Sequence, residues 1–171
     1  QYRWEFGDGA PYVSGTISNP YAVQASHAYT GSPDDIFTAR LTVTKGSDSG
    51  TREYYVQIHA KTLDIEADVA IDEGLWYLHK TLYRTTYSGL PYGYWSGGNA
   101  GSGNTSNNAA NVQAFFSKGH LEGGSADNPY TDDVQRVMRY LFNNLNAYPK
   151  DWFRTCPVAT EAGGNGYIVT E

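Results

Sequence analysis

Histidine and cysteine side chains often carry catalysis or bind metal ions, and this chain has four histidines and a single cysteine. His27, His59, His79 and His120 include no pair at the His-x-x-x-His or His-Glu-x-x-His spacing that brings two ring nitrogens to one zinc ion. Cys156 has no histidine nearby in the sequence to activate its thiol, and no Gly-x-Ser-x-Gly elbow occurs. We therefore predict no catalytic residue and no enzymatic activity.

Three carboxylates are the candidates for holding a metal ion. Asp127, Asp132 and Asp133 flank Asn128-Pro129-Tyr130, and hard carboxylate oxygens in a loop are typical calcium ligands. The alternative is helix capping, because acidic residues at positions 132 and 133 would stabilise the first turn of a helix. We favour capping, and calcium is the one cofactor that stays open.

A glycine-rich run covers residues 97–103. It lacks the Lys-Ser/Thr pair of a phosphate-binding loop and the apolar strand that precedes a dinucleotide site, so it predicts a flexible loop. Asn104 follows it in the glycosylation sequon Asn104-Thr105-Ser106 and is a candidate acceptor if a glycosylating cell secretes the chain.

Aromatic rings concentrate in residues 90–95, which the sequence predicts to be a Gly/Pro loop. Rings on such a loop can stack against sugars or anchor a protein partner. We predict a partner or carbohydrate contact at Tyr92, Tyr94 and Trp95. The alternative is that these rings fold back to cover the neighbouring helices.

The composition is that of a folded chain rich in uncharged polar residues. Hydrophobic residues make up 40% and charged residues 18%, unlike the charge-rich signature of disorder. The net charge of −6 provides no basic face to displace the counterions of a polyanion, which argues against a nucleic-acid partner. No apolar run approaches the roughly 20 residues that span a membrane.

The part of the chain before residue 60 has the period-two alternation of half-buried strands. Apolar and polar residues alternate over 37–44 and again over 54–58, beyond a polar turn at 46–50. A further alternating segment, 2–6, stops at Gly7-Asp8-Gly9, which has the composition of a tight turn. Short strands with polar turns favour a β-sandwich.

Three motifs occur in order within this part. Trp4-Glu5-Phe6-Gly7-Asp8-Gly9 is similar to the signature W-D-F-G-D-G, with Glu5 in place of the first aspartate, and His27-Ala28-Tyr29 is similar to the downstream H-x-Y. Residues 37–44 match the strand that ends domains with this signature. Residues 1–59 therefore resemble the polycystic-kidney-disease (PKD) family of immunoglobulin-like sandwiches. The resemblance implies structural roles for Trp4, Phe6, Gly7, Asp8, Gly9, His27 and Tyr29, with the His27 ring bonded to the sandwich backbone.

PKD domains occur in surface-layer proteins, adhesins and appendages of secreted hydrolases. The resemblance implies an extracellular or cell-surface location, with adhesion, spacing or carbohydrate contact as the role. Family members have further strands before the W-D-F-G-D-G motif, whereas Trp4 is the fourth residue here. We therefore expect an N-terminally incomplete sandwich.

Residues 60–171 predict a helical segment of three helices with a short strand-like tail. The first helix carries acidic residues at its start and basic residues near its end, as the helix dipole favours. The second is expected over 107–118, capped by Ser106 and ended by Gly119, and the third over 132–145, capped by Thr131. The predicted inward residues are Ile71, Leu75, Leu78 and Leu82, then Ala109, Val112 and Phe116, then Val134, Met138, Leu141 and Leu145.

The first and third helices repeat one apolar pattern. Ile71 and Leu75 correspond to Val134 and Met138 at an offset of 63 residues, which suggests an α/α repeat. With Ala70-x-x-x-Gly74-Leu75-x-Tyr77-Leu78, Asn108-Ala109-Ala110 and Gly119-His120, residues 63–148 resemble α/α-toroid repeats of the prenyltransferase and terpene-cyclase superfamily. The D-x-D-D motif of the cyclases and a zinc set are absent from the sequence, so no activity is carried over.

Two function classes follow. The favoured class is an extracellular or cell-surface structural or adhesive module that acts through protein–protein contacts, including contacts with copies of itself in a larger assembly or filament. The alternative is a non-catalytic appendage fragment of a secreted polysaccharide-active enzyme. Tyr167, Ile168 and Val169 form a candidate donor strand that would complete the sandwich of a neighbouring copy.

Overall fold

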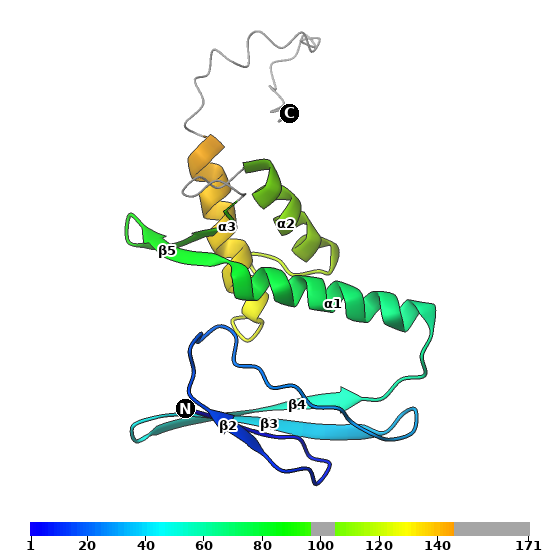
Figure 1. Ribbon diagram of the computed structural model, residues 1–171. Helices are drawn as coiled ribbons and strands as arrows, with labels where there is room; N and C mark the ends of the chain where they lie inside the picture. The colour runs from blue at the N-terminus through cyan, green and yellow to red at the C-terminus, as the bar shows by residue number, and fades with distance from the viewer. Residues whose placement is uncertain (97–104, 146–171) are drawn as a thin grey trace. The chain divides into compact units, whose positions relative to one another are not determined.

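The computed structural model describes residues 1–96 and 105–145, which form a mixed fold of two antiparallel sheets and three helices (Figure 1). The chain divides into two compact units, Gln1–Thr81 and Leu82–Glu171. The sequence predicts a division near residue 60, but α1 (Leu63–Thr81) belongs to the first unit. Its Trp76 Nε1 donates to Gln24 Oε1 at 3.2 Å, and His79 Nε2 donates to the Tyr21 carbonyl at 2.7 Å. Such long-range bonds leave no trace in a local sequence pattern.

The first unit contains a four-stranded antiparallel sheet with the strand order β2-β1-β3-β4. The strands are β1 (Tyr2–Glu5), β2 (Val13–Gly15), β3 (Ile36–Lys45) and β4 (Asp48–Gln57). β3 pairs with β4 along its whole length and with β1 over residues 40–43. The strands predicted from alternation are present, and β4 begins earlier than the sequence suggests.

The early start of β4 follows from the turn that precedes it. Gly46 and Ser47 alone connect β3 to β4, so the turn is shorter than the predicted 46–50. Gly46 has a φ of +61°, which suits the first position of a type II′ hairpin turn. Because this turn matches the twist of the strands, Ser49 and Gly50 pair with β3 instead of extending the loop.

The sheet has one apolar face and one polar face, since neighbouring residues of a strand point to opposite sides. Pairing of Trp4 with Leu41 and of Ala39 with Tyr54 aligns the apolar residues of three strands. The opposite face carries the exposed Arg40–Glu53 ion pair at 2.7 Å. The apolar residues of this face are Tyr2, Trp4, Val13, Phe37, Ala39, Leu41, Val43, Tyr54 and Val56, and Arg52 of β4 lies on the same side, opposite Leu41.

Thr62 caps the start of α1, where its hydroxyl accepts from the Ile65 amide at 3.4 Å. Of the predicted inward residues, Leu75 is buried and Leu78 is half-buried. Ile71 is exposed, and Leu82 lies beyond the end of the helix. His79 is buried instead, because its ring bonds to the Tyr21 carbonyl.

The second unit begins with a β-hairpin where the sequence predicts a helix end and a loop. β5 (Tyr83–Tyr87) pairs with β6 (Leu90–Tyr94), and Ser88 and Gly89 form the turn. Both turn residues have positive φ, +50° and +77°, as a type I′ turn requires. Aromatic and β-branched residues in β5 favour a strand over a continued helix.

Two helices complete the described part of this unit: α2 (Thr105–Ser117) and α3 (Pro129–Leu145). Both begin earlier than the sequence predicts. Ser106 lies inside the first turn of α2, and the α3 cap is Asn128, whose Oδ1 accepts from the Tyr130 amide at 3.0 Å. Pro129 then occupies the first helical position, where its missing N–H costs nothing.

Gly119 ends α2 as predicted, with a φ of +78°. The Gly119 amide donates to the Phe116 carbonyl and the His120 amide to the Phe115 carbonyl, the two bonds of a Schellman motif.

α3 packs against α2 and against β6, and the core of the second unit lies between them. Gly93 allows the close approach, because a side chain there would collide with the Tyr83 carbonyl and press on Arg136. The predicted inward residues Val112, Val134 and Leu141 are buried, and Phe116 and Met138 are half-buried. Ala109 is exposed, and Phe115, Val137 and Tyr140 fill the core as well.

Candidate functional site

The motif residues of the first unit meet in one aromatic cluster. Phe6 is buried and stacks on His27, with 3.9 Å between ring centroids and 12° between planes. Tyr29 presents an edge to His27 at 4.6 Å and stacks on Phe37 of β3 at 5.0 Å. The cluster therefore joins the end of β1, the segment around residues 27–29 and β3.

Asp8 fixes the position of the His27 ring. Its Oδ2 accepts from His27 Nε2 at 2.6 Å, and its Oδ1 accepts from the Ala10 amide at 3.0 Å. These hydrogen bonds, that from His27 first, hold the pKa of Asp8 below its ordinary value. Burial, and then the charge of Asp8, raises the pKa of Tyr29. The sequence predicts a bond from His27 to the backbone, whereas the structure shows one to the Asp8 side chain.

The apolar face of the sheet is the candidate interaction surface of the first unit. Tyr54 is 47% exposed on this face, and its ring lies 5.5 Å from that of Trp4. The Trp4 indole N–H is buried and has no hydrogen-bond partner among the described residues. Most apolar side chains of this face are half-buried, and the first unit has no second sheet within its described residues. We therefore call the face half-covered.

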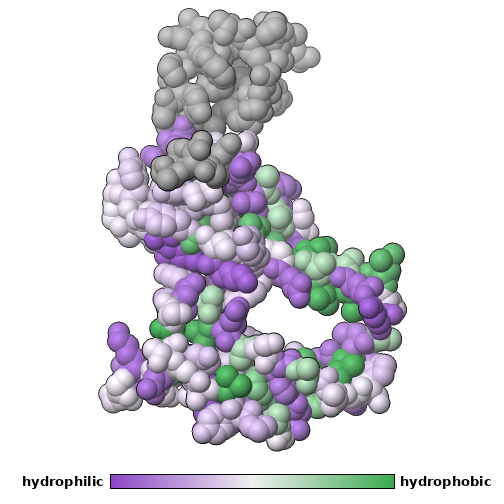
Figure 2. Space-filling model, in the orientation of Figure 1, coloured by the Kyte–Doolittle hydropathy of each residue, from purple (hydrophilic) through white to green (hydrophobic). Residues whose placement is uncertain are grey.

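α1 exposes a second apolar region toward its N-terminal end. Leu63, Val69 and Ile71 are exposed there. Figure 2 shows hydrophobic residues gathered at this end of the helix. Water-exposed apolar groups of this kind are typical of contact surfaces.

The predicted aromatic contact residues have different environments. Trp95 is 8% exposed, its backbone N–H and C=O both bond to the Asn108 side chain, and its ring stacks on Phe115 at 6.2 Å. Trp95 is therefore part of the core of its unit and not a surface contact. Tyr92 and Tyr94 are half-buried in β6. The residues that pack against them come from elsewhere in the chain, so the sequence alone does not identify these neighbours.

Two of the three calcium candidates are engaged in ion pairs, and the third, Asp127, lies in the loop before α3. Asp133 Oδ1 lies 2.7 Å from Arg84 Nη2, and Asp132 Oδ2 lies 2.7 Å from Arg136 Nε. Both aspartates lie early in α3, as the capping interpretation expects. Within residues 1–96 and 105–145, no three His, Cys, Asp or Glu side chains gather closely enough to hold a metal ion.

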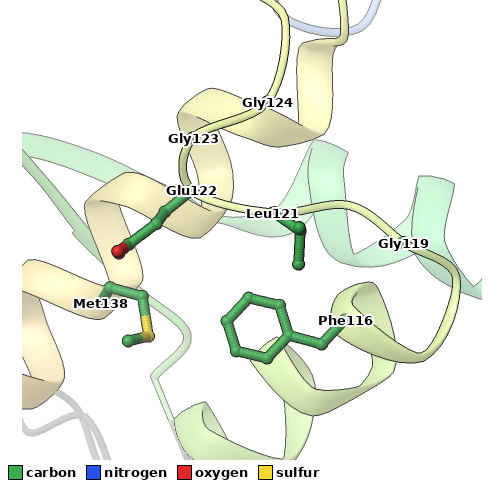
Figure 3. A pocket seen from close by; sticks show the side chains of 7 residues that line it. All are labelled: Phe116, Gly119, Leu121, Glu122, Gly123, Gly124 and Met138. Carbon is green, nitrogen blue, oxygen red and sulfur yellow. The ribbon is translucent and has the colours of Figure 1, made fainter.

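A shallow hollow of about 430 Å³ lies between α2, α3 and the loop that joins them. Figure 3 shows the side chains of Phe116, Leu121 and Met138 around this hollow, with the Glu122 carboxylate at its side. Glu122 is the titratable residue among those that line it, so the hollow offers no acid–base pair. His120 lies within this loop, and its Nδ1 accepts a hydrogen bond from the side-chain Nδ2 of Asn128 at 2.9 Å.

Several predicted residues fall outside the described ranges. These are Asn104, Cys156 and the candidate donor strand Tyr167, Ile168 and Val169. In the described part of the chain, no helix combines the length and the hydrophobicity needed to cross a membrane.

The comparisons with known proteins add no relative: no family model, no curated protein and no solved structure matches this chain.

Proposed function

We propose that this chain is an extracellular or cell-surface structural and adhesive module that acts through protein–protein contacts and has no catalytic activity. The observation that carries the proposal is the half-covered apolar face of the four-stranded sheet. A sheet gains stability by burying its apolar face against another layer. Tyr54 and Trp4 on this face supply the aromatic surface that is typical of interface anchors.

In this proposal the sheet is one layer of a PKD-type β-sandwich, and a second layer from another polypeptide segment covers it. The cluster of Phe6, His27, Tyr29 and Asp8 supports the PKD resemblance, since the motif residues contact each other. The three helices belong to an α/α repeat. Support for that part is the 63-residue offset between Leu75, which is buried, and Met138, which is half-buried, together with the exposed apolar end of α1.

A second copy of the chain is the partner that can be tested directly. Tyr54 and Tyr55 are adjacent in β4 and point to opposite faces, the apolar one and the polar one. We expect Tyr54→Arg to weaken self-association by about tenfold or more, because it places a charge in a desolvated contact. Tyr55→Arg, at a residue that is 75% exposed, should leave association unchanged. Sedimentation velocity over a range of concentrations measures both.

Tyr54→Phe keeps the ring and should associate like the parent, which would show that the ring and not the hydroxyl carries the contact. A parent chain that stays monomeric at every concentration would contradict contacts between copies through this face. Turnover of a polysaccharide by the purified chain would contradict the absence of catalysis.

The alternative, a non-catalytic appendage of a secreted polysaccharide-active enzyme, is favoured by a different observation: the exposed tyrosines of the β5–β6 hairpin.

A further inference from the structure

One face of the β5–β6 hairpin carries four tyrosine rings. Its register pairs Tyr83 with Tyr94 and Tyr87 with Leu90. Since alternate residues share a face, Tyr92 lies on the same side. The ring centroids of Tyr83 and Tyr94 are 5.2 Å apart, and those of Tyr87 and Tyr92 are 5.3 Å apart. We call Tyr83, Tyr87, Tyr92 and Tyr94 the tyrosine face.

The rings of the tyrosine face are both accessible and held in place. Tyr83 is 55% and Tyr87 53% exposed. Tyr92 and Tyr94 are half-buried. The ring centroid of the buried Tyr140 of α3 lies 5.7 Å from that of Tyr92 and 5.2 Å from that of Tyr94. A ligand that stacks on these rings loses little to ordering them, because the inner pair is already packed.

The remaining residues on this face of the hairpin, Thr85 and Leu90, are uncharged as well. Nearby cations are engaged with groups of their own unit: Arg84 with Asp133, Arg136 with Asp132, and Arg139 with the Pro91 carbonyl. The surface therefore offers aromatic rings and phenolic hydroxyls without charge, which favours a neutral ligand.

Amide donors stand beside these rings. Asn143 and Asn144 each place Nδ2 3.5 Å from the Tyr92 hydroxyl, at the long limit of a hydrogen bond, and Asn144 Nδ2 also donates to the Tyr140 carbonyl at 2.8 Å. Rings with negative faces attract the weakly positive C–H groups of a sugar ring, while amides and phenols can bond its hydroxyls. We propose that the tyrosine face binds a neutral oligosaccharide.

The spacing of the exposed rings sets the size of the ligand. Tyr83 and Tyr87 are four residues apart in one strand, a separation of about 13 Å. One sugar ring cannot contact both, so the ligand is a chain of several sugars. This inference is independent of the proposed protein contact, which involves the sheet of the first unit.

Affinity electrophoresis in gels that contain neutral glucans, mannans or xylans, followed by titration calorimetry with oligosaccharides of increasing length, tests the proposal. We expect retention by at least one neutral polysaccharide and affinity that rises with chain length. Tyr83→Ala and Tyr87→Ala should each weaken binding on the order of tenfold, the scale of ring stacking on an aromatic side chain.

Tyr83→Phe and Tyr87→Phe keep the rings and should retain most of the affinity. Tyr55→Ala removes a still more exposed tyrosine from the first unit and should have no effect. Lack of retention on every neutral polysaccharide, or binding that both alanine variants preserve, overturns the proposal. If the parent binds none of the polysaccharides, and a chain carrying both Tyr83→Ala and Tyr87→Ala loses self-association, the tyrosine face is a protein contact instead.

Discussion

At the residue scale, the stability of the first unit depends on the contact between Asp8 and His27. The Asp8 carboxylate accepts from His27 Nε2 at 2.6 Å and from the Ala10 amide at 3.0 Å, and its pKa is lowered. Both bonds favour the ionised carboxylate, and the His27 ring that they orient stacks on Phe6. A charge on an exposed loop thus determines the geometry of an aromatic cluster.

This contact gives a prediction for acid stability. A carboxyl group whose pKa is lower in the folded state stabilises the fold above its unfolded pKa, near 4, and that stability is lost as the pH falls through the folded value. The free energy of unfolding of the parent should therefore decrease below about pH 4. Asp8→Asn should be less stable than the parent at neutral pH and should lose less on acidification.

Urea unfolding at a series of pH values measures this difference. Asp48→Asn removes a carboxylate from the exposed start of β4 and serves as the control. Parallel pH profiles for the parent and Asp8→Asn would show that the contact adds no pH-dependent stability.

At the element scale, the turn after β1 sets the entry into this cluster. Gly7 has a φ of +78°, and a Cβ on it would lie 2.3 Å from the Thr38 carbonyl oxygen. Gly9 has a φ of +85°, but a Cβ there would meet nothing within 4 Å. The two glycines thus share a backbone conformation and differ in the space around them.

We expect Gly9→Ala to cost about 1 kcal/mol, the strain of a left-handed residue. Gly7→Ala should cost about 2–4 kcal/mol, because the clash with the β3 backbone adds to that strain. Chemical denaturation of the two variants measures the difference. Equal losses would mean that the turn relaxes away from β3 without cost.

The elements also show what the sequence could predict. The alternation over 37–44 and the helical spacing in α3 identify β3 and α3, because each buries one side against its own unit. The helical pattern does not reveal the hairpin β5–β6, because Leu82 and Arg84 appear to continue the apolar and basic positions of α1. The signal for the hairpin in the sequence is Ser88-Gly89 between aromatic and β-branched residues. The burial of Trp95 depends on Asn108, a contact that no local pattern contains.

At the scale of the whole molecule, each of the two units has its own buried anchor. The aromatic cluster around Phe6 serves the first. In the second, Arg84 and Asp133 form an ion pair 2.7 Å long with side chains 7% and 0% exposed, which links β5 to α3. Since each anchor lies within one unit, damage to one should leave the other unit folded.

The last prediction compares two neighbouring aspartates of α3. Asp133→Asn should destabilise the second unit by about 3–5 kcal/mol, because it leaves the Arg84 guanidinium buried without its carboxylate. Asp132→Asn should cost less than about 1 kcal/mol, since Asp132 is 41% exposed and its pair with Arg136 is near water. In scanning calorimetry, Asp133→Asn should lower one transition and Gly7→Ala another. A single transition that both substitutions lower equally would show that the two units unfold as one. Equal losses of stability in Asp132→Asn and Asp133→Asn would show that breaking the buried Arg84–Asp133 pair costs no more than breaking the exposed pair.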